Sequence, residues 1–372
     1  MAEGTSFDAA VIGAGLVGSA VALGRARAGQ RGGLRDEGDD RWHASGGNFG
    51  LVWVQGKGAE SGAYAAWTRA SAEAWPAFAA ELQDAVGLDV AYARTGGLSL
   101  CLNEAELEAR ATLIRRMHNQ PAPGANDALM LDAAEVHRLV PSLGPKVVGA
   151  SFCPHDGHAD PLRTLRALQA AFVQAGGGIR RGLRVESIDA TGGGFRLTGQ
   201  VSVIEAGRVV LAAGLENARL APLVGLAAPV RPQRGQILVT QRVPELCPYA
   251  CHRFRQTADG TVMLGDTHEE VGLDTATTQG AAHDLAAYAA ACFPALEHAR
   301  VIRQWAALRV LSPDGLPIYA QSPSHPGAFV VTCHSGVTLA AIHAGELAAA
   351  IAAGGLPAAV ASFAPGRFSE AA

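Results

Sequence analysis

The residues with the clearest chemical potential are a glycine-rich turn at positions 13–18 (Gly-Ala-Gly-Leu-Val-Gly) and an acid, Asp36, that stands 23 positions after Gly13. In a dinucleotide site the first glycine makes a tight turn, the second lets the backbone reach a pyrophosphate, and the third allows close helix packing. The acid accepts hydrogen bonds from the adenosine ribose. Since glycine supplies 45 of the 372 residues, the bare pattern arises readily by chance, and its surroundings must decide.

The elements around the turn fit a dinucleotide site. Phe7–Ile12 is a short apolar run, typical of a strand buried on both faces of a parallel sheet. From Leu16 to Ala28 the apolar residues recur at helical spacing, so the first N–H groups of this helix would face the pyrophosphate. The next strand, Arg31–Arg35, is weak because two glycines and two arginines stand where apolar residues belong. We therefore expect the adenosine end of the site to be loose or exposed; a glycine-rich surface turn is the alternative.

Length and composition limit the class of protein. With 372 residues, 49% hydrophobic and 17% charged, the chain should fold into two intertwined domains rather than remain disordered. A net charge of −4 argues against a nucleic-acid or anionic-membrane partner. No apolar run reaches the roughly 18 residues of a spanning helix, and Met1–Asp8 lacks a basic start. We expect a cytoplasmic protein without a transmembrane segment.

The six cysteines are sparse, which favours free thiols in a reducing compartment. Cys247 and Cys251 are four positions apart and His252 follows, but three residues of this kind do not complete a ligand set. We predict no metal site.

Two loops and one helix precede the middle of the chain. Glu37–Asp40 reads as a turn, and the small residues of Ala44–Gly50 would let a cofactor approach the backbone; the alternative is an ordinary surface loop. Ala63–Val86 is predicted to be a helix kinked at Pro76. The aromatic and aliphatic residues that recur on one face of that helix are predicted to be core residues: Trp67, Trp75, Phe78 and Leu82.

The rest of the chain alternates between segments typical of a parallel sheet and segments typical of an antiparallel sheet. Val90–Leu102 reads as a hairpin turning at Gly96-Gly97. Helices are predicted at Glu104–His118, Asp132–Leu139, Asp160–Gly176, Ala281–Cys292 and Leu339–Ala353. Strands are predicted at Leu183–Ile188, Phe195–Leu197, Val201–Ile204, Arg208–Ala213 and Ala328–Thr332, with alternating strands over Pro232–Met263. Parallel-sheet and antiparallel-sheet segments thus interleave, which indicates a cofactor domain interrupted by insertions that build a substrate domain.

Several motifs occur in the order known from one family. They are residues 11–18 (VIGAGLVG), 155–161 (HDGHADP), 209–214 (VVLAAG), 230–236 (VRPQRGQ), 305–309 (WAALR), 313–317 (PDGLP) and 334–338 (HSGVT). With them the chain resembles, over essentially its whole length, the flavin-dependent amino-acid oxidoreductases of the D-amino-acid oxidase class. The resemblance implies an α/β fold: a Rossmann-like FAD-binding domain with a parallel sheet at 1–86, 147–228 and 301–372, and an interleaved α+β substrate domain on an antiparallel sheet at 87–146 and 229–300.

Residues 47–58 (GNFGLVWVQGKG) resemble more particularly the flavoprotein β subunits of D-hydroxyproline dehydrogenase, opine oxidase and hydrogen cyanide synthase. Such subunits oxidise a carbon–nitrogen bond next to a carboxylate and often work beside iron–sulfur or second flavin subunits. The resemblance therefore implies a small amino-acid or imino-acid substrate and electron-transfer partner subunits.

The resemblance also implies where FAD binds. Its pyrophosphate would lie on the glycine turn, its ribose on Asp36, its adenine near Val185, and the edge of its ring at Gly336 and Val337, where a helix N-terminus stabilises negative charge. The full set implied is Gly13, Gly15, Leu16, Val17, Gly18, Asp36, Glu37, Ser45, Asn48, Phe49, Gly50, Leu51, Val185, Ala213, Gly214, Gly336, Val337 and Thr338. The FAD should be non-covalent, because Ala307 stands where sarcosine oxidases carry the tethering cysteine.

Arg309 is the expected clamp for the substrate carboxylate, since the guanidinium fork fits a carboxylate bidentately. The alternative is an arginine that pairs structurally with an acid. His334 is predicted to shape the catalytic site beside it, and His252 is a weaker candidate. Arg253 and Arg255 would contact substrate if they point inward, although solvent-facing positions are equally compatible.

Three functions remain open at this point. The first is a catalytic FAD-dependent amine oxidoreductase. The second is an NAD(P)-dependent dehydrogenase, since the glycine turn and Asp36 do not distinguish the cofactors. The third is a flavin-binding relay or assembly subunit with little activity alone.

Overall fold

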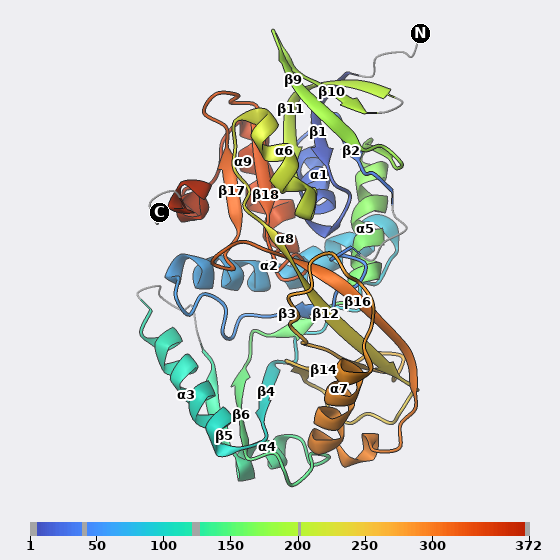
Figure 1. The fold of residues 1–372 in the computed structure, drawn as a ribbon, viewed down its shortest axis with the longest axis vertical. Coiled ribbons are helices and arrows are strands. Elements are labelled where there is room, and N and C mark those ends of the chain that lie inside the picture. The colour runs from blue at the N-terminus through green and yellow to red at the C-terminus, as the bar shows by residue number, and fades with distance from the viewer. Residues whose placement is uncertain (1–5, 39–42, 121–126, 200–201, 369–372) are drawn as a thin grey trace.

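The computed structural model describes residues 6–38, 43–120, 127–199 and 202–368, and Figure 1 shows them as two regions stacked along the long axis. The upper region holds the large sheet with its helices, and the lower region holds two four-stranded sheets. The predicted turn at Glu37–Asp40 lies partly outside the described residues, because Asp39 and Asp40 are not among them.

The large sheet is built around the first strand of the chain. Its order is β17-β18-β11-β1-β2-β8. The bounds are β1 Ser6–Ile12, β2 Gly32–Arg35, β8 Gly178–Arg180, β11 Ser202–Leu211, β17 Ile318–Gln321 and β18 Ala328–Thr332. Every neighbouring pair is parallel except β17 with β18. The expectation that the segment before Gly214 rejoins the first sheet is thus confirmed.

Beside this sheet, β9 (Val185–Thr191) and β10 (Gly194–Gly199) form an antiparallel ribbon that continues onto β11. The prediction of two separate strands at 201–204 and 208–213 was wrong, because β11 runs unbroken through Gly207. A glycine inside an apolar run often marks the end of a strand, but here β11 continues past Gly207 as one strand.

The strand that sequence reasoning judged weak is fully buried. All four residues of β2 are inaccessible, between β1 and β8. A Cβ on Gly32 would lie 3.0 Å from the Phe172 ring, and one on Gly33 would lie 3.1 Å from the Phe7 ring. The glycines therefore make room for two aromatic rings, and the guanidinium of Arg35 lies 4.8 Å from the centre of the Phe7 ring. The reason given for expecting a loose or exposed adenosine end, a weak second strand, was wrong, while the expectation about that end of the site stays a prediction.

Helices cover the large sheet. They are α1 (Leu16–Arg27), α5 (Pro161–Gln174), the short α6 (Asn217–Leu220), and a continuous C-terminal run of α8 (Ala340–Ile342), a π-helical turn (His343–Leu347) and α9 (Ala348–Ala353). Helix α1 packs on α5 and on the C-terminal run (Figure 1). A Cβ on Gly24 would lie 2.1 Å from the carbonyl oxygen of Ala344, so only glycine allows this approach. Asp160 caps α5 as predicted, since its carboxylate accepts from the N–H of Leu162 and of Arg163.

The lower region contains two sheets of four strands. The first has the order β14-β15-β12-β16, with bounds β12 Arg231–Thr240, β14 Phe254–Gln256, β15 Val262–Leu264 and β16 Val301–Leu311, all antiparallel. The second has the order β13-β4-β6-β5, with bounds β4 Gly97–Cys101, β5 Leu129–Asp132, β6 Gly149–Cys153 and β13 Ala250–Cys251. A two-stranded sheet, β3 (Leu51–Val52) with β7 (Gly157–His158), lies between the regions.

The helices of this part are α2 (Gly62–Val86), α3 (Glu104–His118), α4 (Ala133–Leu139) and α7 (Gln279–Cys292). The aromatic face of α2 is buried in the core as predicted, with Pro76 inside a continuous helix. The hairpin predicted for Val90–Leu102 was wrong. Gly97 pairs with Cys153, and β4 lies between β6 and β13, so its neighbours come from distant segments.

The division into domains stays a prediction. In the sheets, β6 and β16, which belong to the segments 147–228 and 301–372, pair with strands of the expected substrate segments. Two segments expected in the cofactor domain thus each contribute one strand to a sheet of the lower region.

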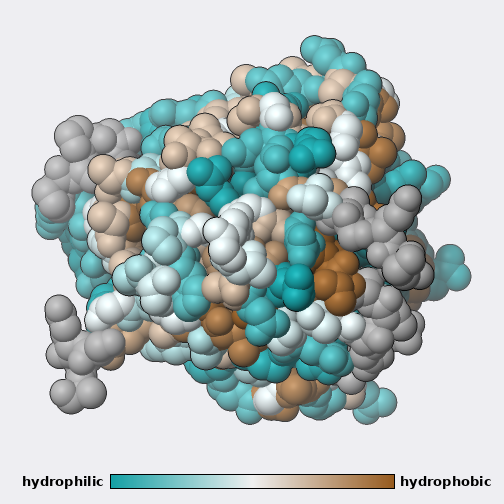
Figure 2. All heavy atoms as spheres, turned by 90° about the horizontal axis from the view of Figure 1, so that it is seen from above, coloured by the Kyte–Doolittle hydropathy of each residue, from teal (hydrophilic) through white to brown (hydrophobic). Residues whose placement is uncertain are grey.

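The face in Figure 2 shows hydrophobic residues in small separate groups among hydrophilic ones, apart from atoms drawn grey. Within the described ranges no single helix is long and apolar enough to cross a membrane, although the bent pair Ala340–Ala353 and Ala358–Phe368, at 97° to each other, could do so by length and composition. Ala340, Leu347 and Ile351 of this pair are buried inside the protein.

Candidate active site

The glycine turn connects β1 to α1 in the way the pattern requires. Gly13 has φ of 100°, and a Cβ there would lie 2.4 Å from the carbonyl oxygen of Ala212 at the end of the neighbouring strand. A Cβ on Gly18 would lie 1.8 Å from the carbonyl oxygen of Gly13. The first glycine is thus needed for the turn, and the last for the close packing of helix on turn.

Two side chains meet the turn from other segments. Asp36 Oδ2 accepts a hydrogen bond from the Ala14 N–H at 2.7 Å, and Ser45 Oγ accepts one from the Leu16 N–H at 2.9 Å. The carboxylate of Glu37 lies 3.7 Å from the Nε of Arg184. The structure therefore brings Asp36 and Ser45 to the start of α1, and their predicted contacts with the cofactor stay a prediction.

Three more of the residues expected around the cofactor, Ala213, Gly214 and Val185, lie near the ends of strands of the large sheet. Ala213 and Gly214 directly follow β11, and the Ala212 N–H donates to the carbonyl of Ile12 at 2.8 Å, which keeps this strand end beside β1. Val185 begins β9, and the N–H of Leu183 donates to the carbonyl of Asp36 at 2.8 Å. All these positions thus line the carboxyl ends of β1, β2 and β11, where α/β sheets bind ligands.

A cavity of about 390 Å³ opens where the large sheet meets β12 and β16. Its wall on one side is the loop before β3, with Gly47, Asn48 and Phe49, and on the other side the turn before α8. Small residues keep the loop close to the sheet, because a Cβ on Gly47 would lie 2.3 Å from the Cβ of Ala307. The strand that follows the loop is joined to the turn before α8, since the carbonyl of Leu51 accepts from Thr338 Oγ1 at 3.2 Å.

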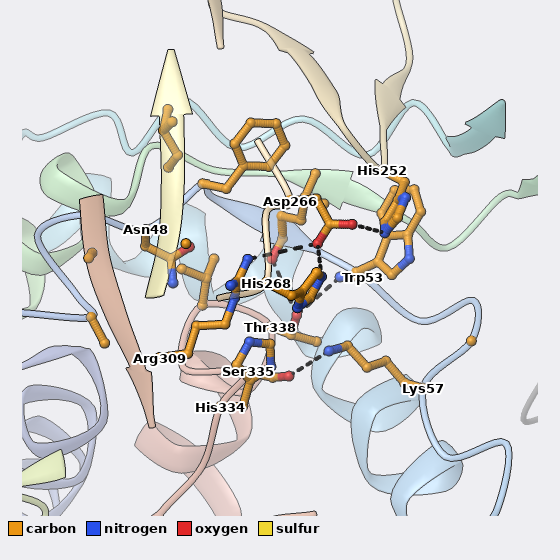
Figure 3. Close-up of a pocket in the computed structure, with 18 of the residues that line it drawn as sticks. Asn48, Trp53, Lys57, His252, Asp266, His268, Arg309, His334, Ser335 and Thr338 are labelled. Atoms are coloured by element: carbon orange, nitrogen blue, oxygen red, sulfur yellow. Dashed lines mark hydrogen bonds and ion pairs between the residues drawn. The ribbon is translucent and has the colours of Figure 1, made fainter. Parts of the chain in front are cut away.

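Arg309 comes from β16 and lines this cavity (Figure 3). Its Nη1 donates to the carbonyl oxygen of Thr267 at 2.6 Å, and its Nη2 lies 3.8 Å from Asp266 Oδ1. The guanidinium lies flat against the backbone of Gly235, where a Cβ would come within 2.6 Å of it. Burial lowers the pKa of Arg309, but a guanidinium keeps its charge at neutral pH.

His334 lines the cavity next to the turn of Gly336 and Val337. Burial, and then the positive charge of Lys57, hold the pKa of His334 well below its usual range. The imidazole is therefore neutral at pH 7 and can accept a hydrogen bond.

Sequence reasoning missed the one carboxylate that the described residues contribute to the cavity lining. Asp266 accepts hydrogen bonds from His252 at 2.9 Å and from His268 at 2.8 Å (Figure 3). Burial alone would raise the pKa of Asp266, but these two hydrogen bonds outweigh it and hold the pKa below its usual range. A signal for this residue could have been its place in a Gly-Asp-Thr-His run directly after a strand, since Asp tolerates the φ of 78° that it adopts here.

The structure does not bring Arg253 and Arg255 to the cavity lining. The guanidinium of Arg253 lies 4.0 Å from the centre of the Tyr288 ring. Arg255 is buried, and its Nε donates to the carbonyl of Phe49 at 2.8 Å, so it supports the cavity loop from behind. Arg255 is thus buried and Arg253 half-buried, and neither side chain lines the cavity.

Residues 8–351 match the protein family described as FAD dependent oxidoreductase (DAO). The chain belongs to this family. It is 42% identical over 328 residues to one of the subunits of opine oxidase from Agrobacterium tumefaciens strain Ach5, and the match covers 88% of each chain. It is also 28% identical over 253 residues to hydrogen cyanide synthase subunit HcnC of Pseudomonas aeruginosa, which covers 66% of this chain and 59% of the relative.

The fold agrees with the family. The crystal structure of glycine oxidase from Geobacillus kaustophilus superimposes with a TM-score of 0.87 at 24% identity, over 96% of this chain and 98% of that one. The predicted fold class is thus confirmed: a mixed, mainly parallel FAD-binding sheet with an antiparallel substrate-side sheet. This DAO-family protein is an FAD-dependent enzyme that oxidises the CH–NH bond of an amino or imino acid. Family membership decides between the two cofactors considered, in favour of FAD over NAD(P).

The residues present fit FAD. The glycine turn forms a cradle that a Cβ at Gly13 or Gly18 would fill, and the cavity beyond it has a wall of small residues, Gly47 and Ala307, suited to a flat ring system. When bound, FAD supplies the hydride acceptor for the reaction. In the described part of the oxidoreductase, no group of three or more His, Cys, Asp and Glu residues could hold a metal ion.

Proposed function

We propose that this chain is a catalytic subunit that oxidises the carbon–nitrogen bond of an opine-like or imino-acid substrate, with FAD held non-covalently. The identity of 42% to the opine oxidase polypeptide, over 88% of its length, is the single observation that carries the substrate class. Because both this relative and HcnC are called subunits, we propose that the chain transfers its electrons to a partner subunit.

The cavity supplies the parts that such a reaction needs. We assign Arg309 as the clamp for the carboxylate next to the reacting carbon, since its Nη1 donates to the carbonyls of Thr267 and Arg234 while its Nε and Nη2 donate to no acceptor in the described residues. A hydride leaves the α-carbon readily only when the neighbouring nitrogen carries a free electron pair. The neutral His334 carries no charge that would repel or protonate the amine, and its imidazole can exchange a hydrogen bond with an amine that binds in its neutral form.

We assign the remaining roles to the residues that the sequence predicted. The glycine turn and α1 would hold the pyrophosphate, Asp36 the ribose, and Gly336, Val337 and Thr338 the edge of the ring. Arg253 and Arg255 act as support in this proposal rather than as substrate contacts, because they contact Tyr288 and Phe49.

A steady-state assay of the isolated chain tests the proposal. Purified protein is supplied with a panel of opines, D-proline and D-hydroxyproline, and with an artificial dye as electron acceptor. Turnover that depends on the substrate supports a catalytic subunit. A yellow protein that turns over none of them, but gains activity when partner subunits are added, supports the alternative of a relay or assembly subunit.

A further inference from the structure

Lys57 is one of only two lysines in the chain, and it lines the active-site cavity (Figure 3). Its ammonium donates to Ser335 Oγ at 2.8 Å, and the hydroxyl of Tyr64 donates to the same oxygen at 2.9 Å. Because Ser335 Oγ accepts both, its own proton remains to be donated, and the ammonium keeps two further N–H donors. The group that completes this cluster must therefore be a hydrogen-bond acceptor.

The ammonium of Lys57 forms no direct ion pair with a carboxylate of the described residues, although the charges of Asp266 and Asp156 act on it from further away. In the described residues no carboxylate lies within 4.0 Å of its ammonium. Asp266 is engaged by two histidines and lies nearest to Arg309 among the cations. The other cation of the lining, Arg110, already donates to Gln55 and Ser151. A cation withdrawn from water in this way is stabilised by an anion that enters with the ligand.

The position of Lys57 is built by the protein rather than left to a mobile surface side chain. The buried carboxylate of Asp156 accepts hydrogen bonds from the N–H groups of Val54 and Gln55, just before Lys57. The N–H of Trp53 donates to Thr338 Oγ1 at 3.1 Å, which joins the same segment to the turn before α8. These bonds fix the loop, so Lys57 approaches the cavity from the loop between β3 and α2, whereas Arg309 enters from β16 (Figure 3).

We propose that Lys57 and the hydroxyl of Ser335 bind a second carboxylate of the substrate, and that this subsite selects secondary amines carrying two carboxylates. This inference rests on the proposed function, in which Arg309 holds the carboxylate next to the reacting carbon. Lys57 and Arg309 reach one cavity from different elements, and the described lining holds one carboxylate, Asp266, so the two cations fit a ligand with two negative charges better than a ligand with one.

A pair of unreactive ligands tests the subsite in the FAD-loaded protein. Thiodiacetate has a sulfur atom in place of the amine nitrogen and carries two carboxylates, whereas (ethylthio)acetate has a methyl group in place of one of them. Titrating each ligand against the visible spectrum of the bound flavin gives its Kd. The parent should bind thiodiacetate at least about tenfold more tightly, which corresponds to about 1.4 kcal/mol.

The variant Lys57→Met keeps the length and removes the charge. It should weaken thiodiacetate binding at least about tenfold and leave (ethylthio)acetate binding within about twofold. Lys146→Met, at the exposed second lysine, is the matched control and should change neither Kd. Equal weakening of both ligands by Lys57→Met would place Lys57 at the shared carboxylate or at the flavin, and no weakening would remove it from the site; either result overturns the inference.

The same titration separates failure of this inference from failure of the proposed function. Arg309→Lys should weaken both ligands, since both carry the shared carboxylate. If Arg309→Lys does so and Lys57→Met affects neither, the clamp stands and the second subsite is wrong. If the parent binds neither ligand, the dicarboxylate subsite is wrong, whatever the steady-state assay shows.

Discussion

Replacing Arg309 by lysine tests the carboxylate clamp through geometry rather than charge. In the parent the guanidinium lies flat on Gly235, and its Nη1 donates to the carbonyls of Thr267 and Arg234, which leaves the edge formed by Nε and Nη2 for the substrate. Lysine keeps the positive charge, but its single ammonium cannot satisfy Thr267 and form two parallel hydrogen bonds to a carboxylate. One charge-assisted hydrogen bond is lost, which is worth about 1.5–3 kcal/mol.

That loss predicts a fall in kcat/KM of about tenfold to about 150-fold, with flavin content and folding near those of the parent. The assay is steady-state oxidation of the best substrate found, beside the matching amine without a carboxylate, which should be a poor substrate and should lose little more in the variant. Arg231→Lys, at an exposed residue paired with Glu270, is the control. The reasoning is refuted if both proteins oxidise the acid equally well, or if the two substrates lose the same factor.

Three further predictions concern the cofactor and the buried network. Acid precipitation should release all the flavin into the supernatant, because the methyl group of Ala307 cannot form a thioether; colour left in the pellet would contradict the non-covalent assignment. Asp36→Ala with Glu37→Ala should lower flavin occupancy by removing one or two hydrogen bonds worth about 1.5–3 kcal/mol each, and unchanged occupancy on gel filtration would remove the acids from the site. Burial raises the pKa of Asp156 from 3.8 to about 7, so the native carboxyl holds its proton longer than the unfolded one, and the parent loses stability as pH rises through this window. Asp156→Asn should therefore gain in Tm relative to the parent between about pH 4 and about pH 7 in thermal melts, and a constant difference would mean that Asp156 is not the titrating group.

Much of the fold follows from local patterns. The glycine turn with its strand and helix, and the acid at the start of α5, are decided by neighbouring residues, so their prediction needed no knowledge of the rest of the chain. The hairpin at Gly96-Gly97 failed because its true partner strand, β6, is about fifty residues away, and local alternation does not reveal a distant partner. The glycines of β2 looked destabilising because the rings of Phe172 and Phe7 that cover them come from other elements.

Some residues of the candidate site could likewise be predicted from local motifs, and others could not. Arg309 and His334 were found because each lies in a recognisable motif, and the structure places both at the cavity. The contacts of Asp266 with Arg309 and of Lys57 with Ser335 join residues far apart in the sequence, so only the folded chain reveals them. The sequence shows that Arg255 is charged, but it does not show whether the side chain enters the cavity or packs behind the cavity loop, so its role could not be assigned from the sequence.

The most direct test of the account is the rate of anaerobic flavin reduction in the isolated chain, measured by rapid mixing with substrate. The substrate is used in two forms, with hydrogen or with deuterium on the carbon next to the nitrogen. The account predicts that the flavin absorbance bleaches in a single turnover without any partner subunit, and that deuterium slows the bleaching severalfold because the C–H bond breaks in that step. Bleaching by dithionite but by none of the amino-acid, imino-acid or opine substrates would contradict the claim that this chain carries out the oxidation.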